Sequence, residues 1–153
     1  MKTILIDSDV LIEVSRGRDA AVLKQWEELG VSDAVLLCSP VTVAEIWHGA
    51  RPKEHAILDA LFASLICVPI NLEIGRRAGE YLSRQHASRH VELGDALIAA
   101  TAVVHGAALW TRNRRYYPMP DVEISRDRDS TPAARRLPMR PSGPRGTPRP
   151  ACG

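Results

Sequence analysis

Acidic side chains follow the strand-like segments of this chain, and their positions are the first indication of chemistry. Asp7 comes directly after the apolar run Thr3–Ile6, and Glu45 lies on the helix predicted after the second such run. Asp95 opens a predicted apolar helix before the fourth run, and Asn113 follows that run. Ligand sites in open parallel α/β sheets form outside the carboxyl ends of the strands, so these side chains are expected to share one site.

Carboxylates gathered in a half-buried site repel one another, so either one of them is protonated or a cation neutralises them. Three carboxylates and an amide oxygen, without clustered Cys or His, form a hard oxygen ligand set that suits Mg²⁺ or Mn²⁺ better than Zn²⁺. Such a cation binds a phosphate oxygen, lowers the pKa of a bound water and stabilises charge during an in-line displacement. The residues therefore indicate hydrolysis of phosphodiester bonds.

Two of these acids also have a simpler explanation. Asp7 can cap a turn at Val10, and Asp95 can cap its own helix. Glu45 is harder to explain in this way, because it lies in the run PVTVAEIW with apolar neighbours and without Lys or Arg four residues away. An acid in that setting is expected to need a partner from elsewhere in the fold.

The elements that must position these residues alternate between strand and helix. Strand-like runs are predicted at Thr3–Ile6, Val35–Cys38, 67–70, 108–111 and 122–124. Helices are predicted at 19–29, from the cap Ser39-Pro40 to Gly49, at 55–64, from the cap Asn71 to about residue 87, and at 93–105. The last helix is the most apolar and is expected to be buried. The alternation predicts a parallel sheet with helices on both faces.

Basic charge is concentrated at the end of the chain. Residues 126–153 contain 7 Arg against 2 Asp and 6 of the 11 prolines, whereas residues 1–125 contain 13 basic and 16 acidic side chains. With so few large apolar residues, the end segment cannot offset its own ordering entropy by burial. We predict a folded domain at 1–125 and a disordered tail at 126–153, which is either a neutral extension or an arm that attracts phosphates.

The cysteines and the hydropathy exclude several classes of protein. Cys38, Cys67 and Cys152 are odd in number and widely spaced, so neither a disulfide framework nor a zinc site is expected, and the first two are predicted to be buried. No apolar run approaches the roughly 18 to 20 residues that cross a bilayer. A cytoplasmic protein without a membrane association is therefore expected.

Four segments together resemble the motifs of PIN-domain ribonucleases, and most closely those of VapC-type toxins of type II toxin–antitoxin systems. They are ILIDSDV at 4–10, VTVAEIWHG at 41–49, ELGDALIAATAVVHG at 92–106 and LWTRN at 109–113. They occur in the family's order and at its typical spacing within residues 1–125. The resemblance implies an α/β fold, a three-layer α/β/α sandwich with a mostly parallel five-stranded sheet.

The resemblance also implies an endoribonuclease that depends on Mg²⁺ or Mn²⁺, with Asp7, Glu45 and Asp95 as its metal-binding acids. Hydrolysis in this family leaves a 5′-phosphate and a 3′-hydroxyl. Asn113 falls on the family's fourth catalytic position, where many relatives carry Asp, and this departure weakens the case for a second tightly bound metal. Thr111 matches a hydroxyl position that orients water.

The side chains around these acids are expected to support them or to hold the substrate. Ser8 and Asp9 are candidates for supporting the metal ligands, with helix capping as an equal alternative. The candidates for phosphate contacts are Arg112, Arg114 and Arg115, with Tyr116 or Tyr117 available to stack on a base and a solvated loop as the alternative. Trp47 is predicted to lie in the core or at an interface, and His48 to be structural.

The resemblance further implies three partners: an RNA substrate, a cognate antitoxin protein and a second copy of the chain in a homodimer. Two other functions remain open on the sequence. Asp7-Ser8-Asp9 has the DxD form of aspartyl-phosphate phosphatases, although Val10-Leu11 stands where those enzymes need Gly-Thr and Lys53 is the last lysine. A catalytically weak module of the same fold that binds RNA or an antitoxin is the second alternative, and three retained carboxylates argue against it.

Overall fold

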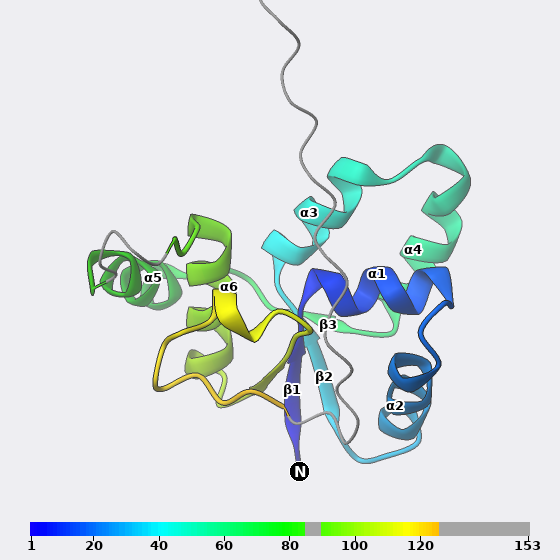
Figure 1. Ribbon diagram of the computed structural model, residues 1–153, viewed down its shortest axis with the longest axis horizontal. Helices are drawn as coiled ribbons and strands as arrows, with labels where there is room; N and C mark the ends of the chain where they lie inside the picture. Colours follow the sequence, from blue (N-terminus) through cyan, green and yellow to red (C-terminus); the bar gives the residue numbers. More distant parts are fainter. Residues whose placement is uncertain (85–89, 126–153) are drawn as a thin grey trace, which may run out of the picture.

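Four short strands form one parallel sheet at the centre of the structure, a computed structural model that describes residues 1–84 and 90–125 (Figure 1). The strands are β1 (Thr3–Ile6), β2 (Val35–Cys38), β3 (Ile66–Cys67) and β4 (Ala108–Trp110), in the order β3-β2-β1-β4. Ile4 of β1 lies opposite Leu36 of β2 and Ala108 of β4. Because every pairing is parallel, the carboxyl ends of all four strands meet at one edge of the sheet.

The predicted sheet was one strand too large. Residues 122–124 do not form a strand, since Ile124 pairs with Leu109 only at an isolated parallel bridge. The third strand is also shorter than predicted and ends at Cys67. Beyond Cys67, the N–H of Val68 still donates to the carbonyl of Cys38 at 3.0 Å, and Pro69 follows.

Helices cover both faces of this sheet, which confirms the three-layer α/β/α arrangement (Figure 1). Ile4 and Ile6 point into the core on one face of β1, and Leu5 points into the core on the other. This alternation follows from the period of two along a strand. The first face is covered by α1 (Ser8–Arg16), α2 (Ala20–Gly30), α3 (Pro40–Gly49) and α4 (His55–Ala63), the second by α5 (Leu72–Arg84) and α6 (Leu93–Val104), and η1 (Pro52–Glu54) and η2 (Arg114–Tyr116) are short 3₁₀ turns.

Polar side chains cap α2, α3 and α5, and the caps Ser39 and Asn71 were predicted, whereas the cap Asp19 was not. Asp19 accepts from the backbone N–H groups at the start of α2, Ser39 does so for α3 before Pro40, and Asn71 accepts from the N–H of Ile74 at 3.0 Å. These caps satisfy donors that have no partner inside a helix. Helix α5 was predicted to reach about residue 87 and is described to Arg84, because residues 85–89 lie outside the described part.

Helix α1 was not anticipated, although it begins directly after β1. Val10 and Leu11 are buried on its inner side, and Gly17 ends it with φ of 64° and an N–H that donates to the carbonyl of Glu13. A positive φ of this size favours glycine because it has no Cβ. The start of α1 makes Asp7 a helix cap as well as the residue at the end of β1.

Helix α6 is buried as its composition predicted, since seven of its residues, Asp95 among them, are buried.

The two cysteines that were predicted to be buried differ in their exposure to solvent. Cys38 is fully buried, and burial, followed by the nearby Cys67 thiol, raises its pKa to about 12. The prediction for Cys67 was wrong, because β3 is a two-residue edge strand and leaves this side chain exposed.

The predicted tail at 126–153, with Cys152, lies outside the described residues. Within the described ranges, no helix is long and apolar enough to cross a membrane.

Candidate active site

Asp7 lies at the carboxyl end of β1 and is 4% exposed. Its Oδ1 accepts from the backbone N–H of Ser8 at 2.8 Å. Its Oδ2 accepts from two hydroxyls, those of Thr111 at 2.9 Å and Tyr117 at 2.8 Å. Hydrogen bonds from α1, from the end of β4 and from the segment after η2 therefore fix the orientation of this carboxylate.

Glu45 is exposed on α3 and accepts a hydrogen bond from α1. The Ser8 hydroxyl donates to Glu45 Oε2 at 2.7 Å and so joins α3 to the start of α1. A Cβ built on Gly94 would lie 3.3 Å from Glu45 Oε1, so the absence of a side chain at Gly94 leaves room for this carboxylate. Asp95 follows directly, 2% exposed in the first turn of α6, where the helix dipole favours a carboxylate.

Asp9 is held by two donors from the segment after β4. Its Oδ2 accepts from the backbone N–H of Arg112 at 3.0 Å and from the Asn113 amide at 2.8 Å. Its Oδ1 is buried without a hydrogen-bond partner among the described residues. Burial, followed by the negative charge of Asp7, raises the pKa of Asp9 to about 7.

Replacing Asp9 by asparagine should stabilise the protein in EDTA, and more at pH 8 than at pH 5. The raised pKa means that the folded state holds the Asp9 proton more tightly than the unfolded state, so stability is lost as pH rises from about 4 to about 7. The amide oxygen that the substitution introduces can accept from the same two donors without a charge. About two pKa units of this shift act between pH 5 and pH 8, so we expect the melting-temperature gain at pH 8 to exceed that at pH 5 by roughly 5 to 10 °C, measured by scanning calorimetry.

The control is Asp33→Asn, at an exposed position before β2 and so at the opposite edge of the sheet. It should shift the melting temperature equally at both pH values. An equal shift for Asp9→Asn at pH 5 and pH 8 would contradict a buried, ionising carboxylate at position 9.

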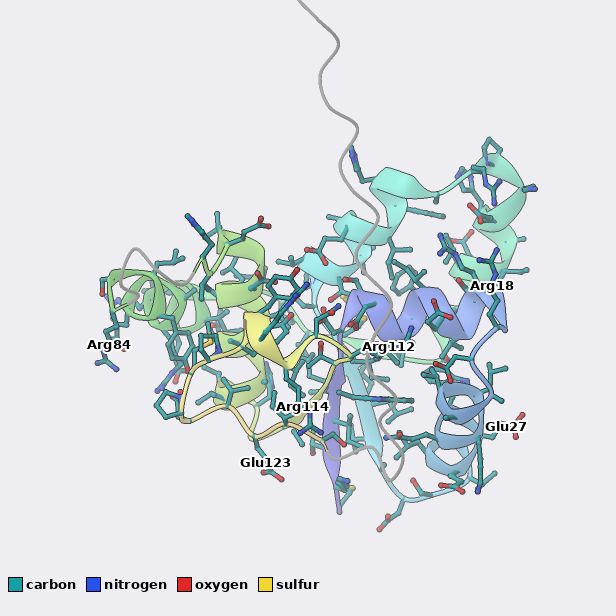
Figure 2. All side chains as sticks on the ribbon, viewed as in Figure 1. Arg18, Glu27, Arg84, Arg112, Arg114 and Glu123 are labelled. Carbon is teal, nitrogen blue, oxygen red and sulfur yellow. The ribbon has the colours of Figure 1, made fainter. Side chains whose placement is uncertain are left out.

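Arg112 does not point away from the fold. Its guanidinium lies 3.0 Å from Asp19 Oδ2 and 3.4 Å from Glu13 Oε1, with its side chain 20% exposed, so it joins the end of β4 to α1 and α2 (Figure 2). These contacts favour a structural role over the predicted phosphate contact. Arg114 and Arg115 are exposed on η2, and Arg115 stacks over the Tyr116 ring at 5.0 Å from its centroid.

Of the two tyrosines that were candidates for base stacking, Tyr117 does not suit that role. Tyr117 is 5% exposed, so its ring cannot stack on a base, and its role was missed by sequence reasoning. Burial, followed by the charge of Asp7, raises the pKa of Tyr117 far above its usual range, and Asp95 and Asp9 act in the same direction.

Trp47 is 40% exposed with its ring against His55, so it is not a core residue, and His48 is exposed.

The side chains at this site supply mainly carboxylate oxygens, which are the ligand type that a hard divalent cation prefers. They do not form a finished cage: in the described part of the chain, no three His, Cys, Asp or Glu side chains converge as a ready-made metal site. The buried Oδ1 of Asp9 and the two buried acids Asp7 and Asp95 nevertheless place negative charge where water cannot screen it. The residues therefore fit a cation in type and location, with side-chain reorientation needed to bind it.

The same segments match a family model for the PIN domain over residues 4–122. Solved structures with the same fold include VapBC2 from Rickettsia felis, bound to a DNA fragment from its promoter. One of its chains superposes with a TM-score of 0.71 at 16% identity, covering 80% of this chain and 97% of that one.

Curated relatives are closer in sequence. Ribonuclease VapC10 of Mycobacterium tuberculosis is 41% identical over 117 residues, which cover 76% of this chain and 86% of that protein. Ribonuclease VapC19 of the same species is 34% identical over 128 residues, covering 78% of this chain and 96% of that protein. The chain therefore belongs to the PIN-domain family and, within it, to the VapC ribonucleases.

Proposed function

We propose that this protein is an endoribonuclease that depends on Mg²⁺ or Mn²⁺, hydrolyses RNA phosphodiesters and serves as the toxin of a toxin–antitoxin pair. The observation that carries the proposal is the gathering of Asp7, Asp9, Glu45 and Asp95 at the carboxyl end of the sheet in a VapC-family chain. Asp7, Glu45 and Asp95 would hold the cation. When bound, it would neutralise these carboxylates, activate water and stabilise charge on the phosphate.

The chain's own residues prepare this site. Ser8 holds Glu45 toward the start of α1. Thr111 fixes Asp7 and accepts from the backbone N–H of Asn113 at 3.1 Å, so the end of β4 is tied to the same carboxylate. The Asn113 amide donates to Asp9, so Asn113 orients the carboxylate of Asp9 and not that of Asp7. The exposed Arg114 and Arg115 would contact RNA phosphates.

Two partners follow from the family. Solved structures with this fold include VapBC complexes, such as DNA-bound VapBC from Salmonella typhimurium (TM-score 0.69), and this supports a cognate antitoxin for this chain. A homodimer is the second proposed assembly. The mass of the purified protein in solution, with and without the product of the neighbouring gene, tests both.

The function is tested with purified protein and a mixed RNA pool, in Mn²⁺, in EDTA, and after Mn²⁺ is restored. We expect cleavage with Mn²⁺, loss in EDTA and recovery on restoration. Mn²⁺ should also raise the melting temperature, because a ligand at 100 times its Kd stabilises the native state by about 2.7 kcal/mol.

Cleavage that survives EDTA would contradict the metal dependence. Neither cleavage nor stabilisation by Mn²⁺ would instead favour the catalytically weak binding module. The phosphatase alternative has lost its support, because the chain belongs to the PIN-domain family.

A further inference from the structure

The hydroxyl of Tyr117 occupies an unusual position, because it is a neutral donor among carboxylates. It donates to Asp7 Oδ2 at 2.8 Å across 110 positions of sequence. The carboxylates of Asp95 and Asp9 lie near this hydroxyl as well. A tyrosine hydroxyl is protonated at neutral pH, so Tyr117 is a hydrogen-bond donor there.

The two oxygens of Asp7 are used unequally. Each carboxylate oxygen has two lone pairs. Oδ2 accepts from both Thr111 and Tyr117, so its capacity is filled. Oδ1 accepts from the Ser8 backbone N–H at 2.8 Å, while the Ser8 hydroxyl lies 3.5 Å away and is directed at Glu45 instead. One lone pair of Oδ1 thus remains for a cation.

We propose that Tyr117 is a positioning residue for the cation site: with Thr111 it occupies Asp7 Oδ2 and so presents Oδ1 to the metal. This inference rests on the proposed metal-dependent function. The ring of Tyr117 packs in the core beside α6, and a phenylalanine would supply that packing equally well. The hydroxyl is the part that needs a further explanation, and Asp7 is its hydrogen-bond partner.

The chain contains a matched control. Tyr81 on α5 is also 5% exposed, and its hydroxyl also donates to a carboxylate at 2.8 Å, that of Asp121. Asp121 also pairs with Arg77 and is not part of the acidic cluster. Tyr81→Phe removes the same atom, at the same donor–acceptor distance, from a carboxylate outside the site.

The experiment titrates Mn²⁺ into apo protein by calorimetry, with RNA cleavage measured over the same Mn²⁺ range. Substitutions behind metal ligands commonly cost 10- to 100-fold in affinity or activity, and we expect Tyr117→Phe to raise the Kd for Mn²⁺ about tenfold. Its cleavage rate should recover in part at high Mn²⁺. Tyr81→Phe should leave the Kd unchanged, whatever either variant does to the melting temperature.

Thr111 also donates to Asp7 Oδ2, so substitutions at Thr111 test the same inference. Thr111→Val should raise the Kd for Mn²⁺ as Tyr117→Phe does, and Thr111→Ser, which keeps the hydroxyl, should restore it. If Tyr117→Phe does not fold, this pair decides the inference. Wild-type affinity for Mn²⁺ in Tyr117→Phe, or in Thr111→Val where that pair decides, would overturn it. Failure of the wild-type protein to bind Mn²⁺ would overturn the proposed function itself, and that result appears before any variant is made.

Discussion

Asp7→Asn should lower RNA cleavage by at least about 10³-fold while leaving the protein folded. A bound cation supplies several kcal/mol of transition-state stabilisation, and each 1.36 kcal/mol corresponds to a factor of ten in rate. The substitution removes the charge of an acid that accepts three hydrogen bonds, from the Ser8 N–H and the hydroxyls of Thr111 and Tyr117. Asn caps a helix about as well as Asp, so α1 keeps its start. Single-turnover cleavage in Mn²⁺ measures the loss, and circular dichroism checks the fold.

Asp121→Asn is the matched control for Asp7→Asn. Asp121 also accepts a tyrosine hydroxyl at 2.8 Å, yet it is outside the acidic cluster. Its cleavage rate should equal that of the wild-type protein. A rate for folded Asp7→Asn within tenfold of wild type would rule Asp7 out as a metal ligand and would direct attention to a contaminating nuclease.

Arg112→Ala should destabilise the protein by about 2 to 3 kcal/mol, because it leaves two partly buried carboxylates without their cation. Glu13 and Asp19 are 20% and 30% exposed in these pairs, so water screens them only in part. The loss corresponds to roughly 5 to 10 °C in melting temperature for a domain of this size. Thermal unfolding measures it.

Arg114→Ala separates this structural role from RNA binding. Arg114 is exposed on η2, two positions away, and its replacement should change stability by no more than about 0.5 kcal/mol. RNA affinity should fall in Arg114→Ala and stay near wild type in folded Arg112→Ala. The reverse ranking of the two variants in RNA affinity would return Arg112 to its predicted role as a phosphate contact.

The local pattern of the sequence predicted most of the architecture. Short apolar runs alternate with amphipathic segments, and good caps such as Ser39 and Asn71 mark where helices begin. Helix α1 was not predicted, because Asp7-Ser8-Asp9 was interpreted as a chemical motif and not as the start of a helix. Its buried Val10 and Leu11, with Gly17 after it, were the available signal.

The sequence by itself indicated that acids would lie toward one edge of the sheet, because the carboxyl ends of parallel strands share that edge. Asp7, Glu45 and Asp95 could be chosen as candidates without coordinates. Only the tertiary structure decided which neighbours hold them. Hydrogen-bond partners such as Ser8 with Glu45, and Asp7 with Tyr117, are 37 and 110 positions apart, and no periodicity encodes such a pairing. Arg112 likewise pairs with Asp19 from 93 positions away, because the fold brings these two partly buried side chains together and each is stabilised by its opposite charge.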